Sequence, residues 1–195
     1  MNVVGVLLAA GRSERFGGDK LIAPLRHSDG DVEAGTPLGV AACRHLVVAL
    51  VEAIAVVRPS DAVLADLLAS TGARVIRCAN ANDGMGASLA CGVRATSDAD
   101  GWVVALADMP WIRPATIKAL ADALAKGADI IAPSYRGTRG HPVGFSKRHY
   151  AQLVALRGDE GARAIVAANR AGVDLVATDD AAVVRDVDTP AQLDG

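Results

Sequence analysis

The sequence predicts an α/β fold in three layers, with a mostly parallel sheet between two layers of helices. Two observations lead to this prediction. Short apolar segments alternate with helical patterns along the chain, and several of these segments are apolar throughout, as strands covered on both faces must be. The length of 195 residues suits one domain, because domains commonly hold roughly 100–200 residues. We therefore expect residues 1–195 to form a single domain.

The expected strands are short, rich in β-branched residues and bounded by turn residues. One of them begins at Pro142, after a turn rich in glycine and arginine. Because proline has no N–H for a ladder hydrogen bond, we expect this strand to pair antiparallel at an edge of the sheet. The full set comprises Val3–Leu8, Ala53–Val57, Arg74–Arg77, Trp102–Leu106, Asp129–Ala132, Pro142–Phe145 and Val173–Val176.

Helical patterns lie between the expected strands. One begins at Pro114, a first-turn position where the missing N–H of proline costs nothing. The expected helices are Leu38–Glu52, Ala62–Ser70, Ala87–Ala95, Pro114–Lys126 and Gly161–Ala171. In β-α-β units, ligands bind beyond the carboxyl ends of the strands, so the loops that follow the strands are where the chemistry is expected. The loops in question follow Leu8, Cys78, Leu106 and Ala132.

Composition and charge argue against two classes of partner. The chain holds 20 Lys and Arg against 22 Asp and Glu, so it has no overall positive field to hold a nucleic acid polymer. Aromatic residues make up only 3%, which leaves few platforms for stacking bases. The N-terminal apolar run of about ten residues is too short for a bilayer, and no basic stretch precedes it. We expect a cytoplasmic protein with no membrane partner and with its three cysteines reduced.

The loop after the first expected strand is rich in glycine and basic residues. The sequence from Leu8 to Lys20 reads LAAGRSERFGGDK. Its backbone N–H groups and the side chains of Arg12, Arg15 and Lys20 can converge on one anion, which favours a polyphosphate ligand. The loop has neither P-loop spacing nor GxGxxG. An ordinary βα turn with solvated basic side chains is the alternative interpretation.

Two further segments carry candidate ligand residues. Gly84 and Gly86 precede a helix near Ala87, and a helix N-terminus favours negative charge, although a plain capped helix start fits the same residues. Asp108 directly follows an apolar strand. There it could hold Mg²⁺ against substrate phosphates, or it could cap the turn before Pro110.

Two aspartates near the C-terminus complete the set. The sequence RDVDTP from Arg185 to Pro190 alternates polar and apolar residues, which predicts a short edge strand. Such a strand would place Asp186 and Asp188 on the same face. Asp188 also suits a helix cap before Thr-Pro.

Together these motifs resemble those of the MobA-like nucleotidyltransferase family. The segment Leu8–Lys20 is similar to the family signature LAAGxSxRxGxxK. Segments similar to the GMGxSL, DMP and DxDTP motifs follow at Gly84, Asp108 and Asp186, in the family's order. The resemblance implies a Rossmann-like fold with a small antiparallel edge portion. It also implies a Mg²⁺-dependent enzyme that transfers a nucleotide from a nucleoside triphosphate.

The resemblance implies roles for individual residues at the phosphate end. Asp108 and Asp188 would bind Mg²⁺, with Asp188 preferred over Asp186. Arg15 and Lys20 would hold the triphosphate, so Arg15, Lys20 and Asp108 are the implied catalytic residues. The implied nucleotide-binding residues are Leu8, Ala9, Ala10, Gly11, Arg12, Asn82, Gly84, Gly86 and Ser88.

Three other segments carry weaker expectations. Arg139 and His141 lie in a stretch similar to the family's GxRGHPV, which faces the second substrate. The segment Gly158–Arg163 resembles GDxGAR and has the acidic residues of a helix N-terminus, with no assigned role. The polar segment Arg26–Thr36 has no periodicity and is expected to form a surface loop.

Within the family, the resemblance is closest to the molybdenum cofactor cytidylyltransferase branch. It implies attack by the terminal phosphate of a molybdopterin-type cofactor on the α-phosphorus of CTP, with release of pyrophosphate. Ala10 in LAAG is associated with CTP, whereas FGGDK is similar to the guanylyltransferase branch, so GTP is the alternative. A molybdenum hydroxylase is an implied partner. A non-catalytic carrier of nucleotide or cofactor would keep the glycine loops but would have less need of both aspartates.

Overall fold

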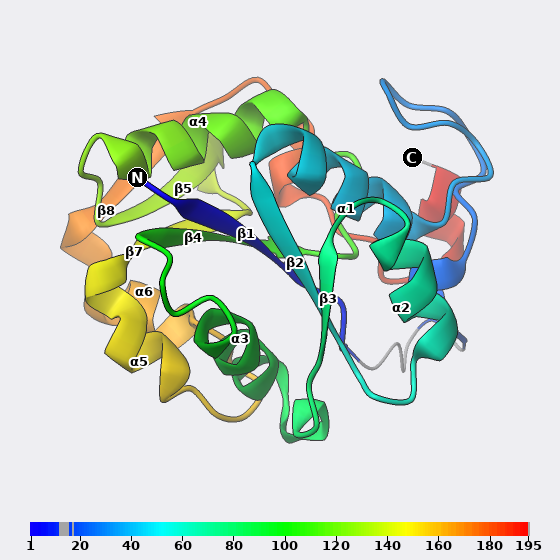
Figure 1. Cartoon of the computed structure of the whole chain (residues 1–195). Helices are drawn as coiled ribbons and strands as arrows, with labels where there is room; N and C mark the ends of the chain where they lie inside the picture. The colour runs from blue at the N-terminus through cyan, green and yellow to red at the C-terminus, as the bar shows by residue number, and fades with distance from the viewer. Residues whose placement is uncertain (12–15, 17, 195) are drawn as a thin grey trace.

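The computed structural model describes residues 1–11, 16 and 18–194. Within these residues, eight strands form one sheet in the order β3-β2-β1-β4-β7-β5-β6, and β8 also pairs with β5 (Figure 1). The strands β1 to β4 pair in parallel, and so do β5 and β8. The strands are β1 (Val3–Leu8), β2 (Glu52–Val57), β3 (Arg74–Arg77), β4 (Gly101–Leu106), β5 (Ile130–Tyr135), β6 (Thr138–Arg139), β7 (Val143–Ser146) and β8 (Val173–Ala177).

Helices cover both faces of this sheet. The helices α1, α2 and α4 lie on one face, and α3, α5 and α6 lie on the other (Figure 1). The α-helices are α1 (Leu38–Ala49), α2 (Ala62–Ala69), α3 (Met85–Arg94), α4 (Pro114–Ala125), α5 (Tyr150–Val154) and α6 (Arg163–Ala168). The 3-10 helices are η1 (Lys20–Ile22), η2 (Ala81–Asp83), η3 (Lys147–His149), η4 (Arg170–Gly172), η5 (Ala181–Val184) and η6 (Pro190–Asp194).

The central strand β1 contributes to the hydrophobic cores on both faces, because successive side chains of a strand point to opposite sides. Leu7 packs in the core that includes Leu46 of α1, and Val6 packs in the core that includes Leu89 of α3. A Cβ on Gly92 of α3 would lie 2.9 Å from side-chain atoms of both Val6 and Val56. Helix α3 therefore approaches the sheet at a distance that only glycine permits, and this fixes the position of its N-terminus.

The three-layer, mostly parallel sheet is confirmed, and each expected strand has a counterpart in the structure. The expectation that Pro142–Phe145 lies at the sheet edge is wrong. Its counterpart β7 is antiparallel but lies inside the sheet, with Phe145 opposite both Trp102 of β4 and Ile130 of β5. The strand begins at Val143. Pro142 thus stands outside the ladder, and its missing N–H places no restriction on where the strand pairs.

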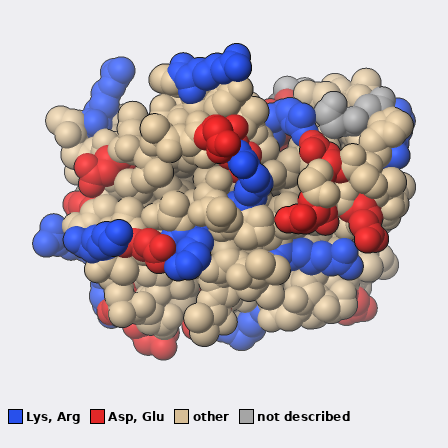
Figure 2. Space-filling view, turned by 90° about the horizontal axis from the view of Figure 1, so that it is seen from above, with Lys and Arg blue, Asp and Glu red and all other residues tan. Residues whose placement is uncertain are grey.

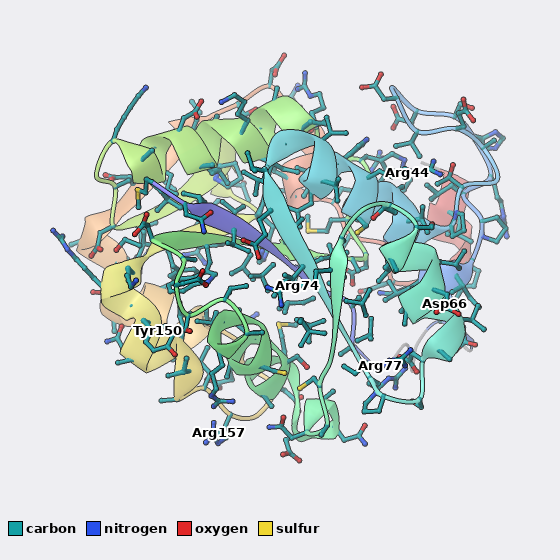
Figure 3. The ribbon with its side chains drawn as sticks, in the orientation of Figure 1. Arg44, Asp66, Arg74, Arg77, Tyr150 and Arg157 are labelled. Carbon is teal, nitrogen blue, oxygen red and sulfur yellow. The ribbon has the colours of Figure 1, made fainter. Side chains whose placement is uncertain are left out.

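The expected edge strand around Asp186 is also wrong, because residues 185–189 contain no strand. The N–H of Val187 instead donates to the carbonyl of Asp108 at 3.0 Å. The expected helix Gly161–Ala171 is shorter than predicted and is followed by η4. The short elements β6 and α5 were not anticipated. Tyr150 lies at the start of α5 (Figure 3). Its ring stacks on that of Trp102, with the ring centroids 5.9 Å apart.

The segment Arg26–Thr36 is fixed to the C-terminal part of the chain. The N–H of Arg26 donates to the carbonyl of Leu193 at 3.1 Å, and Asp29 forms an ion pair with Arg185. Arg185 in turn lies over the ring of Trp111, 3.8 Å from its centroid. Val32, in the middle of the segment, is buried in the core. The segment therefore contributes one apolar side chain to the fold, although its composition suggested only a surface loop.

Charged residues of both signs are interspersed on the face shown in Figure 2. Over the described residues, every helix is too short or too polar to cross a membrane. The thiols of Cys43 and Cys78 are buried, and Cys91 is partly buried. Burial raises the pKa of the Cys78 thiol to about 11, which keeps it protonated at neutral pH.

Candidate active site

A cavity of about 560 Å³ opens at the carboxyl ends of β1 and β4. Loops that follow parallel strands meet at this edge of the sheet, so residues distant in sequence line one space. Several of the predicted site residues share this lining: Leu8, Ala10, Gly11, Lys20, Asn82, Gly84, Ser88, Asp108 and Asp188. Three of the four loops singled out from the sequence therefore reach the cavity, and the loop after Ala132 does not.

Lys20 makes three polar contacts at the cavity. Its Nζ donates to Asp108 Oδ2 at 2.9 Å and to the carbonyl of Val187 at 2.7 Å. It also lies 3.9 Å from Asp188 Oδ1. The side chain is 11% exposed, because Lys20 begins η1 and the next residue, Leu21, is buried in the core. The chain therefore holds a cation at this position with little freedom.

Asp108 and Asp188, which lie beside that ammonium, form a cluster with a third carboxylate, that of Asp186. Asp108, Asp186 and Asp188 each offer one oxygen, and the three oxygens lie within 4.8 Å of one another. The hydrogen bond from Val187 to Asp108 brings the C-terminal segment against the end of β4 and so assembles the group. Carboxylate oxygens are the ligands that Mg²⁺ and Mn²⁺ prefer. Asp108, Asp186 and Asp188 thus fit a hard divalent cation.

The turn between β3 and α3 forms the other side of the cavity. Asn82 and Gly84 lie in this turn, and the Ser88 hydroxyl donates to the carbonyl of Gly84 at 3.4 Å. Gly86 is buried and does not line the cavity, and its N–H donates to the carbonyl of Gly158 at 2.7 Å. The first turn of α3 is therefore capped from within the protein.

Two other predicted residues, Ala9 and Arg139, lie away from this lining. Ala9 is buried, donates to the Val56 carbonyl at 2.9 Å and lines a smaller neighbouring cavity of about 180 Å³. Arg139 is exposed on β6. Arg12 and Arg15 lie outside the described residues.

His141 is held next to the C-terminal segment rather than in the cavity wall. Its backbone N–H donates to the carbonyl of Val183 at 2.8 Å. Burial lowers the pKa of the His141 imidazole, and the charge of Asp108 opposes this effect. His141 is therefore close enough to the acidic group to sense its charge, while its ring favours the neutral form.

Sequence reasoning missed one polar residue of the cavity, Asp159. It lies in the GDxGAR-like segment, whose resemblance to the family was visible without indicating a role. Only the fold shows that this segment packs on the β3–α3 turn. Reasoning from the sequence also chose Asp188 over Asp186, whereas the structure brings both to Asp108.

Comparisons with known proteins identify the family of this chain. Residues 5–189 match the family described as the MobA-like NTP transferase domain. The purine catabolism protein PucB of Bacillus subtilis (strain 168) is 32% identical over 196 residues, which cover 98% of this chain and 94% of PucB.

Solved structures are similar over the same length. The crystal structure of Rv0371c from Mycobacterium tuberculosis H37Rv has a TM-score of 0.81 at 29% identity, covering 98% of this chain and 95% of that one. The Rv0371c complex with manganese has a TM-score of 0.75 at 28% identity, with 98% and 96% covered. The family match spans most of the sequence and includes every described loop of the cavity. This chain therefore belongs to the family of MobA-like NTP transferase domains.

Proposed function

We propose that this protein joins the CMP part of CTP to the terminal phosphate of a molybdopterin-type cofactor and releases pyrophosphate. Membership of the family makes it a nucleotidyltransferase. The base, the second substrate and the use of Mg²⁺ are the proposed parts. We further propose that residues 1–195 act as one domain and that the reaction takes place in the cytoplasm.

The observation that carries the proposal is the position of Lys20 beside Asp108 and Asp188 at the carboxyl end of the sheet. The described residues that line the cavity include three carboxylates, those of Asp108, Asp159 and Asp188, and one ammonium, that of Lys20. A triphosphate would be repelled by this balance of charge. Asp108 and Asp188 would hold a divalent cation, whose charge would offset this repulsion and whose preference for oxygen ligands suits the carboxylates present. The manganese complex of the similar protein Rv0371c supports this choice.

The proposed reaction needs alignment more than acid–base chemistry. A bond forms between an oxygen of the acceptor phosphate and the α-phosphorus, and the bond from the α-phosphorus to the bridging oxygen breaks, so that pyrophosphate leaves. The acceptor phosphate is already an anion, so no general base is required. A cation held by Asp108 and Asp188 would supply positive charge to the phosphate oxygens. Lys20, with Arg15, would donate to the leaving pyrophosphate, where negative charge increases in the transition state.

We propose that the second substrate extends from the cavity toward β6 and the start of β7. Arg139 and His141 are proposed to bind its phosphate-bearing end. The similarity to a purine catabolism protein supports a molybdenum hydroxylase as the partner that receives the product. Such a hydroxylase would use the dinucleotide form of the cofactor.

Calorimetric titration tests the proposal. The protein is titrated with CTP, GTP and ATP in the presence and absence of Mg²⁺, with Asp108→Ala as the site variant. Asp122→Ala, which removes an exposed carboxylate on α4, is the control. We expect CTP binding that requires Mg²⁺ and is lost only in Asp108→Ala. Preference for GTP would assign the protein to the guanylyltransferase branch, and no binding of any nucleotide by the unmodified protein would refute the proposal.

A further inference from the structure

The segment from Arg157 to Gly161, between α5 and α6, contributes Asp159 to the lining of the cavity, and we call it the wall segment. The carbonyl of Gly158 accepts the hydrogen bond from Gly86 at 2.7 Å. A Cβ on Gly86 would lie 2.6 Å from the carbonyl oxygen of Arg157, and one on Gly84 would overlap Asp159 Oδ1. Arg157 lies on the loop that passes α3 (Figure 3). The wall segment therefore packs directly on the β3–α3 turn, at glycines that leave it room.

This packing decides where a phosphate can bind. The N-terminus of a helix is a common anion site because its first N–H groups are unpaired and its dipole is positive there. In α3, however, the Gly86 N–H is already used by Gly158, and the carboxylate of Asp159 already lies at Gly84. A phosphate at this position would be repelled by the Asp159 carboxylate and could not accept a hydrogen bond from the Gly86 N–H. The phosphates of a substrate therefore belong near Lys20.

The two regions belong to different parts of the cavity lining. Asp159 packs on Gly84, at the start of α3, whereas Lys20 pairs with Asp108 in the turn that follows β4. A substrate whose phosphates lie at Lys20 would thus present an uncharged part to Asp159.

We propose that Asp159 is a specificity-determining residue that accepts hydrogen bonds from uncharged O–H or N–H groups of a substrate. Within the described residues, Asp159 makes no hydrogen bond or ion pair, its side chain is exposed, and it lines the cavity. A carboxylate in that position repels phosphates and attracts hydroxyl and amino groups. The inference rests on the proposed function, since it requires a phosphorylated substrate in this cavity.

Two parts of the substrates carry the required chemistry. The nucleotide offers ribose hydroxyls and the amino group of its base. The second substrate, if it is a pterin, offers the amino group of a heterocycle. The chemistry recognised is the same in both cases, so the experiment measures the two substrates separately.

The experiment compares Asp159→Ala and Asp159→Asn with Glu160→Gln. Glu160 is the adjacent exposed carboxylate and does not line the cavity. The dissociation constant of CTP with Mg²⁺ is measured by calorimetry, and the KM of the molybdopterin-type cofactor by pyrophosphate release. Urea denaturation measures the free energy of unfolding of each variant and so shows whether the substitution has destabilised the fold.

We expect Asp159→Ala to weaken the binding of one of the two substrates roughly tenfold, with kcat at saturation unchanged. A weaker CTP complex assigns the contact to the nucleotide, and 2′-deoxy-CTP or 3′-deoxy-CTP then shows whether a ribose hydroxyl is involved. A raised KM for the cofactor alone assigns the contact to the second substrate. Equal behaviour of the Asp159 variants and Glu160→Gln in both measurements would overturn the inference. Failure of the proposed function would give a different result, because the unmodified protein would then bind no nucleotide.

Discussion

The Lys20 ammonium lies 2.9 Å from Asp108 Oδ2, so a positive charge of the chain itself neutralises a carboxylate that we propose as a metal ligand. An ammonium and a divalent cation compete for the same oxygen lone pairs. Entry of a metal ion would therefore require Lys20 to move, and the phosphates of a nucleotide offer it another partner. This relationship suggests that metal and nucleotide bind together rather than in succession.

The first prediction concerns metal binding without nucleotide. Lys20→Met keeps the length of the side chain and removes its charge, so the competing ion pair disappears. We expect Mn²⁺ to bind roughly tenfold more tightly, equivalent to about 1.4 kcal/mol. The electron paramagnetic resonance signal of free Mn²⁺ measures this affinity. Lys118→Met, which removes an exposed ammonium on α4, is the control, and unchanged Mn²⁺ affinity in Lys20→Met would contradict the competition.

The second prediction concerns the effect of Lys20 on the turnover rate of the enzyme. If Lys20 stabilises the leaving pyrophosphate, Lys20→Ala lowers kcat by on the order of a hundredfold, as loss of one charge-stabilising donor does elsewhere. The affinity for nucleotide should change much less. Steady-state kinetics of pyrophosphate release, with binding measured separately, distinguishes the two effects. A loss of affinity with normal turnover at saturation would show that this role is wrong.

The third prediction ranks the three aspartates. Asp108 and Asp188 are partly buried, whereas Asp186 is exposed. We expect Asp108→Asn and Asp188→Asn each to weaken Mn²⁺ binding by at least about tenfold, and Asp186→Asn by less than about threefold, because water screens an exposed charge. Titration with Mn²⁺ in the presence of nucleotide measures all three. An equal effect of Asp186→Asn would make it a full ligand and would refute the preference for Asp188.

The fourth prediction concerns stability. Asp180 is 3% exposed, and its carboxylate accepts hydrogen bonds from the Arg113 N–H, the Thr116 hydroxyl and the Ala182 N–H. Asp180→Ala leaves these donors without a partner and should lower the free energy of unfolding by about 2–3 kcal/mol. Asp179→Ala removes an exposed ion pair and should change it by less than about 0.5 kcal/mol. Urea denaturation measures both, and similar values for the two variants would count against this account.

The fifth prediction is a pH dependence. The hydrogen bond from Ser146 lowers the pKa of Asp129 below its ordinary value of 3.8, and His149 acts in the same direction. A carboxyl group with a lowered pKa stabilises the fold above its unfolded pKa, and this stabilisation is lost as the pH falls through the folded value. Asp129→Asn should cost at most about 1 kcal/mol at pH 7, since the side chain is 38% exposed and water screens it. Urea denaturation at a series of pH values from 7 downward checks this, and a difference between the two proteins that does not shrink as the pH falls below 3.8 would argue against it.

Much of the fold is determined by local sequence. Strands such as β1 and β3 were predicted at their observed limits, because apolar runs and bounding turn residues lie within a few positions of each other. The loop motifs at Leu8–Lys20, Gly84–Ser88 and Asp108 could likewise be recognised along the chain. Since parallel strands present their carboxyl ends at one edge, the meeting of these loops follows from the fold class.

Other features depend on contacts between distant residues. The strand β7 lies inside the sheet because it pairs with both β4 and β5, as at Phe145. The hydrophobic pattern of a short strand does not predict which strands it pairs with. The packing of Gly158 and Asp159 on Gly84 and Gly86 joins segments about 70 residues apart. Sequence by itself determined most of the strands and helices and the motifs, because these arise from near neighbours. Tertiary structure alone decided which carboxylates meet Lys20 and which one lies at the start of α3, because charge and packing act through space.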